Sequence, residues 1–335
     1  MSLLEVRDLN VTFPTPDGLV RAVQGVTFSV GAGQTLGVVG ESGSGKSVAC
    51  MTVMGLVRGA RTSGQVLFDG RDVLAMPEEE RRRLRGAEIG IVFQDPLSSL
   101  HPLYKVGWQI AEAIRAHERV SSSAARARAV EQLALVGIPS PAQRADEYPY
   151  QYSGGMRQRA MIAMALALSP KLLIADEPTT ALDVTVQAQI IELIKQLQAE
   201  LGMAVIMITH DLGVVAGLAD QVAVMYAGKV VEYAERRRLY YTPAHPYTRG
   251  LLASLPTRSH GRNRLAQITG QPPSLISLPT GCSFHPRCPV ALERCQFEEP
   301  PFVQVDPQGL QGSSCWLAHA PQGPGAVAAT RGPQS

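Results

Sequence analysis

Short apolar runs and helix-like stretches alternate up to about residue 240. Runs typical of buried strands occur at Thr35 to Val39, Lys171 to Ala175 and Ala204 to Ile208, and each precedes a stretch with helical spacing. Strands that alternate with helices predict a parallel sheet covered by helices. The pattern therefore predicts an α/β fold.

The stretch from Asp183 to Leu201 has the clearest helical period, and Gly202 follows it where a helix commonly ends. This helix is expected to cover one face of the sheet. From about Ser98 onward the strand signals give way to helix-like stretches, Val106 to His117 and Ser123 to Val136. They predict an inserted helical subdomain over about residues 98–157.

Composition changes near residue 240, because 14 of the 24 prolines lie between Tyr241 and Ser335. We place a domain boundary there, with an α/β domain over 1–240 and a small extension over 241–335. Met1 to Phe13 alternates like a strand and predicts no targeting signal. The longest nearly apolar run, Ala160 to Leu168, is too short to span a bilayer, so any membrane role is expected to come through partner subunits.

The overall composition is that of an ordinary globular protein. Hydrophobic residues make up 45% of the chain and charged residues 18%, which excludes a disordered or fibrous architecture. The net charge of +2 gives no basis for a nucleic-acid surface. The functional interpretation therefore depends on motifs.

A glycine-rich loop follows the first predicted strand and opens a helix. Its residues are Gly40, Glu41, Ser42, Gly43, Ser44, Gly45, Lys46 and Ser47. Backbone N–H groups in such a loop can surround phosphate oxygens, and the helix N-terminus adds positive charge. The lysine would neutralise the terminal phosphates, and the last serine would offer a hydroxyl to Mg²⁺. The motif and its context favour an ATP-binding loop over a plain glycine turn.

Two carboxylates end the buried strand that begins near Lys171. Ligands of open parallel sheets bind at the carboxyl ends of the strands, where Asp176 and Glu177 stand. Asp176 is expected to hold Mg²⁺, and Glu177 to polarise the water that attacks the γ-phosphate. A simple helix start is the alternative for such a pair, and the glycine-rich loop argues against it.

A serine and two glycines, Ser153, Gly154 and Gly155, open a predicted helix ahead of this acidic pair. With the residues up to Gln158 they resemble the signature motif of the ATP-binding-cassette family. The resemblance implies a P-loop NTPase with a RecA-like core, an N-terminal β subdomain and an inserted helical subdomain. It also implies that the signature binds the γ-phosphate of the ATP held by the opposite subunit, with a helix N-terminus aimed at phosphate.

The same resemblance implies roles for four further residues. Gln94 is similar to the loop glutamine that contacts Mg²⁺ and relays the nucleotide state to membrane subunits. Asp183 lies in a segment that resembles the loop crossing the dimer interface, and His210 is similar to the switch histidine that contacts the γ-phosphate. Phe13 is a candidate for stacking on adenine, with core packing as the alternative.

The expected catalytic residues are therefore Glu177 and His210, and the expected Mg²⁺ site comprises Ser47, Gln94 and Asp176. In the family, the P-loop and the signature of one chain face different nucleotides. A head-to-tail dimer is therefore implied, which ATP would close and hydrolysis would open.

Three stretches resemble the ATP-binding subunits of dipeptide and oligopeptide importers: Ile91 to Leu100, Ala175 to Gln189, and His245 to Thr248. In such importers two distinct ATPase chains pair beneath two transmembrane permease subunits, on the cytoplasmic face of the inner membrane. An extracytoplasmic binding protein delivers the peptide. This chain resembles the first ATPase, so a heterodimer with a sister subunit is implied. Importers of nickel or other small solutes share much of the pattern and are the alternative.

A cassette ATPase of DNA repair, chromosome organisation or translation is the alternative from another class. Such proteins usually carry a long coiled coil or two cassettes, and no sustained heptads occur between Ser47 and Ser153. A pure binding module is disfavoured because every expected catalytic position is filled. No nucleic-acid partner is expected.

Four of the five cysteines lie in the extension: Cys282, Cys288, Cys295 and Cys315. Four thiolates could hold zinc or an iron–sulfur cluster, although the paired spacing of common zinc sites is lacking. Peptide-importer ATPases carry a similar set assigned to a 4Fe-4S cluster, so the resemblance favours the cluster over zinc or unligated cysteines. We therefore expect a 4Fe-4S cluster with a structural role.

Overall fold

A computed structural model describes residues 2–180, 182–255 and 267–319 of the chain. Two β-sheets organise these residues. The first is antiparallel, in the order β2-β1-β4-β5. Its strands are β1 (Ser2–Thr15), β2 (Gly18–Gly31), β4 (Arg61–Phe68) and β5 (Arg71–Asp72).

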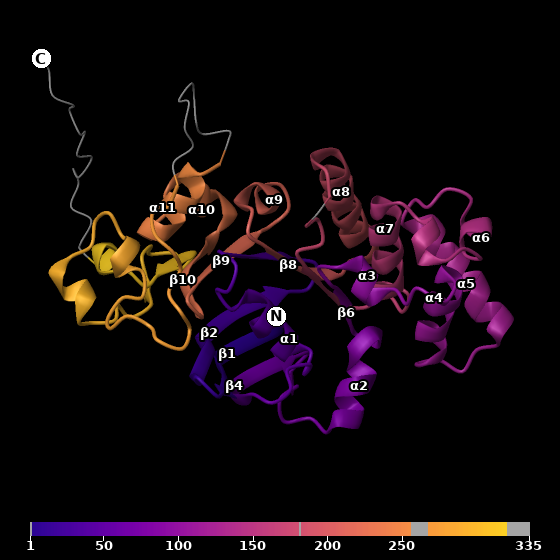
Figure 1. Cartoon of the computed structure of the whole chain (residues 1–335), viewed down its shortest axis with the longest axis horizontal. Coiled ribbons are helices and arrows are strands. Elements are labelled where there is room, and N and C mark those ends of the chain that lie inside the picture. The colour runs from indigo at the N-terminus through magenta and orange to yellow at the C-terminus, as the bar shows by residue number, and fades with distance from the viewer. Residues whose placement is uncertain (1, 181, 256–266, 320–335) are drawn as a thin grey trace, which may run out of the picture.

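The second sheet runs through the middle of the molecule in the order β11-β12-β10-β9-β3-β8-β7-β6 (Figure 1). Its strands are β3 (Thr35–Val39), β6 (Ile89–Val92), β7 (Leu172–Asp176), β8 (Ala204–Thr209), β9 (Gln221–Tyr226), β10 (Lys229–Glu235), β11 (Val303–Gln304) and β12 (Gln311–Ser313). The five strands from β9 to β6 are parallel. The predicted α/β class is confirmed.

Along the chain, the helices occur between these strands. They are α1 (Lys46–Val53), α2 (Glu78–Ala87), α3 (Pro96–Ser99), α4 (Val106–Arg115), α5 (Ser122–Leu135), α6 (Pro141–Arg144), α7 (Gly154–Ala165), α8 (Val184–Leu201), α9 (Leu212–Ala216), α10 (Arg236–Tyr241) and α11 (Pro246–Ala253). No helix in the described part of the chain is long and apolar enough to cross a membrane.

The central strands β3, β7 and β8 are buried at every position and mostly apolar, because both faces of the sheet are covered. Along β7, Leu173 and Ala175 point into an apolar cluster that includes residues of α7, α8 and α9. Leu172 and Ile174 point into a second cluster, which includes residues of α1 and the antiparallel sheet. Successive side chains of β7 thus point to opposite faces of the sheet and pack into two different apolar clusters.

Helices α4, α5 and α6 follow β6 along the chain and pack with α7 at one end of the molecule. The extension lies at the opposite end of the long axis, with the core sheet between them (Figure 1). Helix α8 ends at Gly202, which has a left-handed backbone with φ of 65°, as its position in the sequence predicted.

The extension is joined to the core sheet by backbone pairing. Strand β12 pairs antiparallel with β10, and the short strand β11 pairs with β12. The boundary near residue 240 stays a prediction, and strands from both sides of it share one sheet. Because β12 pairs with β10, β10 with β9, and β9 with β3, the shared sheet holds the extension on the same side of the molecule as the loop that follows β3.

Candidate functional site

The glycine-rich loop connects β3 to α1 at the centre of the parallel sheet. Two of its glycines lie against backbone from neighbouring strands. A Cβ atom on Gly40 would lie 2.2 Å from the carbonyl oxygen of Met225, and one on Gly45 would lie 2.2 Å from that of Ala22. Gly45 also has a positive φ of 96°, which favours glycine. The loop therefore requires glycine at both positions.

The Lys46 side chain is folded into this loop and is 5% exposed. Its Nζ donates hydrogen bonds to the carbonyl oxygens of Gly40 (2.7 Å) and Glu41 (2.9 Å). Burial lowers the pKa of Lys46 from its ordinary value, and the nearby carboxylates of Glu177 and Asp176 oppose that shift. The ammonium group is thus held where a phosphate could replace its carbonyl partners.

Asp176 ends β7 directly beside the start of α1. The Ser47 hydroxyl donates a hydrogen bond of 2.9 Å to Oδ1 of Asp176. Burial raises the pKa of Asp176, and the bond from Ser47 lowers it. A hydroxyl and a carboxylate are the hard oxygen ligands that Mg²⁺ prefers, so these two side chains fit that ion.

Glu177 turns its carboxylate toward the same region. Its backbone has a φ of 46°, which is uncommon for a residue other than glycine and often marks a functional position. Its Oε2 accepts hydrogen bonds from the hydroxyl of Thr180 (2.8 Å) and from Nε2 of Gln94 (3.3 Å). Nδ1 of His210 lies 3.4 Å from the same oxygen. Side chains from three separate loops thus meet at one carboxylate oxygen.

Gln94, Glu177 and His210 line a cleft of about 670 Å³ together with the glycine-rich loop. The sequence-predicted residues that line it are Phe13, Glu41, Ser42, Gly43, Ser44, Gly45, Lys46, Ser47, Gln94, Glu177 and His210. Phe13 lines the cleft from β1 and also packs against an apolar cluster, so its two predicted roles are compatible.

The signature residues lie outside this cleft. Ser153 caps α7, because its hydroxyl accepts a hydrogen bond of 3.3 Å from the backbone N–H of Met156. Asp183 caps α8 in the same way, through Val186 at 3.0 Å. Ser153, Gly154 and Asp183 are exposed. The structure therefore presents them at the surface, apart from the chain's own phosphate-binding loop.

The prediction of a 4Fe-4S cluster, or of zinc in its place, is wrong. The described ranges contain no group of three or more His, Cys, Asp or Glu side chains that could hold a metal ion. Cys282, Cys288, Cys295 and Cys315 line one cavity of about 20 Å³, which is room for roughly one water molecule. Burial raises the pKa of Cys282 to about 11 and also raises those of Cys288 and Cys315, which disfavours the thiolate that binds metals.

Three contributors to the site were missed by the sequence interpretation. Thr180 bonds Glu177, and the hydroxyl of Tyr247 accepts a hydrogen bond of 2.9 Å from the backbone N–H of Glu41. Arg287 of the extension forms an ion pair with the Glu41 side chain. Thr180 could have been found from its place just after the acidic pair. No local signal connects Tyr247 or Arg287 to a loop some 200 residues earlier.

The strand–loop–helix with its lysine, beside a strand that ends in two carboxylates, defines a P-loop NTPase. The chain matches the ABC transporter family over residues 23–180 and the C-terminal region of oligopeptide/dipeptide transporters over residues 231–295. It resembles the solved dimer of the ATP-binding cassette MJ0796 bound to ADP and Pi, with a TM-score of 0.63 and 28% identity. That match covers 70% of this chain and 99% of the other.

Relatives match over nearly the whole chain. The chain is 52% identical to the oligopeptide transport ATP-binding protein OppD of Bacillus subtilis, over 95% of this chain and 89% of that protein. It is 51% identical to the dipeptide transport ATP-binding protein DppD of Escherichia coli, over 90% and 92%. The chain therefore belongs to the ABC transporter ATP-binding proteins of the OppD and DppD type, whose enzymatic activity is ATP hydrolysis coupled to transport.

Proposed function

We propose that this chain hydrolyses ATP to drive the import of dipeptides or oligopeptides across a membrane. The observation that carries the proposal is the cleft in which Lys46, Glu177 and His210 lie together, within a chain about half identical to peptide-transport ATP-binding proteins. Those relatives span both the cassette and the extension. The names of these relatives support a peptide as the transported solute, and the residues of the cleft support ATP hydrolysis.

ATP binds with its phosphates in the loop Gly40 to Ser47 and its adenine against Phe13. Lys46 exchanges its carbonyl partners for the terminal phosphates, because charged acceptors form stronger hydrogen bonds. Ser47, Asp176 and Gln94 would hold Mg²⁺, which would supply positive charge against the phosphates. One carboxylate is enough for such a site, since the nucleotide supplies further oxygen ligands.

Glu177 acts as the general base of hydrolysis. Its Oε2 accepts bonds from Thr180 and Gln94, which fix the carboxylate at the edge of the cleft. In this position the carboxylate accepts a hydrogen bond from the attacking water and polarises it. His210 lies beside the same oxygen and contacts the γ-phosphate, so it connects the phosphate to the base.

Ser153, Gly154, Gly155 and Asp183 serve the ATP held by a second ATPase subunit. The exposure of Ser153, Gly154 and Asp183 at the starts of α7 and α8 supports this assignment, because a helix N-terminus at the surface can meet a phosphate carried by another chain. The partner is a sister ATP-binding subunit in a heterodimer. ATP closes the pair, and hydrolysis reopens it.

The two ATPase subunits work on the cytoplasmic face of the inner membrane, beneath two transmembrane permease subunits. An extracytoplasmic binding protein delivers the peptide to the permeases. The relatives support this arrangement through their names as transport ATP-binding proteins. Opening and closing of the ATPase dimer then moves the permeases as rigid bodies.

The test is uptake by the transporter reconstituted in lipid vesicles, with Mg-ATP on the side of the ATPase subunits. Radiolabelled dipeptide, pentapeptide and nickel are offered in parallel. We expect saturable, ATP-dependent uptake of at least one peptide and no uptake of nickel. Uptake of nickel without either peptide would contradict the proposal, and vesicles carrying Glu177→Gln measure the background.

A further inference from the structure

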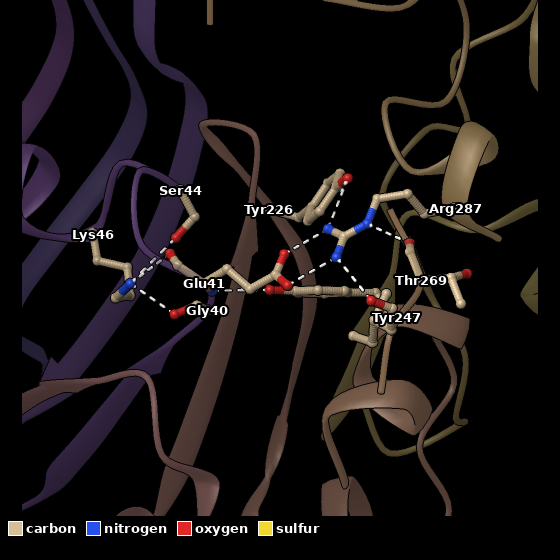
Figure 2. A network of polar contacts seen from close by, with 9 residues as sticks. Gly40, Glu41, Ser44, Lys46, Tyr226, Tyr247, Thr269 and Arg287 are labelled. Carbon is tan, nitrogen blue, oxygen red and sulfur yellow. Dashed lines mark hydrogen bonds and ion pairs between the residues drawn. The ribbon is translucent and has the colours of Figure 1, made fainter. Parts of the chain in front are cut away.

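An ion pair joins the extension to the phosphate-binding loop. Arg287 forms two hydrogen bonds to the Glu41 carboxylate, from Nη1 to Oε2 at 2.6 Å and from Nη2 to Oε1 at 2.9 Å (Figure 2). The two residues are 246 positions apart. Parallel pairing of a guanidinium with a carboxylate is the most directional ion pair that side chains form.

Arg287 is held rigidly on its own side. Its side chain is 5% exposed, and its Nε donates a hydrogen bond of 3.1 Å to the carbonyl oxygen of Thr269. The Tyr226 hydroxyl lies 3.4 Å from Nη1. A buried guanidinium with these neighbours cannot follow Glu41 if the loop moves, so it defines where the Glu41 carboxylate lies.

Glu41 connects this arginine to the lysine of the cleft. Its backbone N–H donates to the Tyr247 hydroxyl, and its carbonyl oxygen accepts a hydrogen bond from Lys46 (Figure 2). The side chain and the N–H group of Glu41 thus face the extension, and its carbonyl oxygen faces Lys46 of the nucleotide site. The first turn of the loop is therefore attached to the extension through both Arg287 and Tyr247.

The charge of Glu41 is the reason that this contact matters for the nucleotide. Glu41 lines the cleft that also holds Lys46, so an unpaired carboxylate there would repel the phosphates of ATP. Arg287 cancels that charge and directs the carboxylate toward the extension. No other Lys or Arg side chain in the described ranges forms an ion pair with Glu41.

We propose that Arg287 is a positioning residue for ATP binding, which neutralises Glu41 and keeps its carboxylate away from the bound phosphates. This inference rests on the proposed ATP-binding function. It assigns to the extension a direct part in nucleotide affinity. The effect of Arg287 on affinity is electrostatic, so its size depends on the number of phosphates on the ligand.

The test measures binding of Mg-ATP, and of AMP, to the full chain by calorimetry, with Arg287→Met as the first variant. We expect ATP affinity to fall about tenfold and AMP affinity to fall less than threefold, because repulsion grows with the charge of the ligand. In the assembled transporter, KM for ATP should rise by a similar factor with kcat nearly unchanged. Arg294→Met is the control, since it also removes an arginine from an ion pair of the extension, but the partner of Arg294 is Glu298 and not Glu41.

The double variant Glu41→Gln with Arg287→Met removes both charges and separates repulsion from simple loss of structure. We expect its ATP affinity to return to within about threefold of the unaltered chain, because nothing then repels the phosphates. A double variant as weak as Arg287→Met alone overturns the inference, as does an Arg287→Met chain that binds ATP normally. Should Arg287→Met not fold, the double variant is compared with the unaltered chain, and a loss of ATP affinity well beyond threefold overturns the inference.

Failure of the underlying function gives a different result. If the unaltered chain does not bind Mg-ATP, the proposed ATP site itself is wrong. If the unaltered chain binds Mg-ATP and Lys46→Ala abolishes binding, the site stands, and the variants of Arg287 then test this inference alone.

Discussion

The phosphate-binding loop and the signature segment each lead into a helix N-terminus, but the two helix starts are built differently. Helix α1 begins after Gly45, which has no side chain to cap it, and the first residues of the helix, Lys46, Ser47 and Val48, line the cleft. Helix α7 begins after Ser153, whose hydroxyl caps it. One N-terminus lies among buried charged groups, and the other lies at the surface.

The difference shows what one chain can do alone. Strands of one sheet bring Lys46, Asp176, Glu177 and His210 to one region: Asp176 accepts a hydrogen bond from Ser47, Glu177 lies beside His210, and both carboxylates act on the pKa of Lys46. Among the described residues, the hydroxyl of Ser153 bonds only the backbone of its own helix, at Met156. Under the proposed function, a complete catalytic site would combine the cleft of one subunit with the signature of another.

The largest effect is expected from a substitution that alters the cleft and leaves the signature intact. Glu177→Gln removes the base but keeps the size of the side chain, so we expect kcat for ATP hydrolysis to fall at least about 100-fold. Affinity for ATP should stay within a few fold. Phosphate release by the assembled transporter measures the effect, and a turnover near that of the unaltered protein would contradict the role of Glu177.

A smaller effect is expected from a substitution that alters the signature and leaves the cleft intact. Ser153→Ala removes a hydroxyl that the partner's ATP would contact, so we expect turnover of the assembled transporter to fall about tenfold. Binding of ATP to the isolated chain should not change. Steady-state hydrolysis and calorimetry measure the two quantities.

Ser121→Ala is the matched control, because Ser121 caps α5 through Ala124 just as Ser153 caps α7. Both substitutions lose a helix cap, and only Ser153→Ala should lower hydrolysis. Equal turnover in the two variants would show that Ser153 acts as a cap alone.

The smallest expected effect concerns stability on the signature side. Asp183→Ala removes the cap of the 18-residue helix α8 and should lower the free energy of unfolding by about 1 kcal/mol. Asp183→Asn retains an acceptor oxygen and should cost only a few tenths of that. Urea denaturation of the full chain measures both, and an Ala variant as stable as the unaltered chain would rule out the cap as a source of stability.

Motifs that lie on one strand–loop–helix junction were predictable. The loop from Gly40 to Ser47 and the acidic pair at Asp176 both follow apolar strands, and parallel strands deliver their carboxyl ends to one edge of the sheet. Gly202 was predictable for the same local reason, since a positive φ at a helix end favours glycine.

The cysteines show where spacing is not sufficient. Four cysteines in one segment predicted a metal ligand set, and the structure does bring all four to one cavity. The volume between them and the burial of their thiols depend on side chains from other parts of the fold, among them His245 and Pro246. The sequence contains no measure of that volume, and the metal prediction failed there.

The sequence by itself determined the class of protein, the phosphate-binding loop and the order of its chemical groups, because these depend on neighbours within a few residues. Only the tertiary structure decided that the signature lies at the surface and that Arg287 meets Glu41. Contacts across 246 positions depend on strand pairings such as that of β12 with β10, which no local pattern specifies. The extension therefore reaches the nucleotide site through the fold, and its part in ATP binding could be inferred only from that contact.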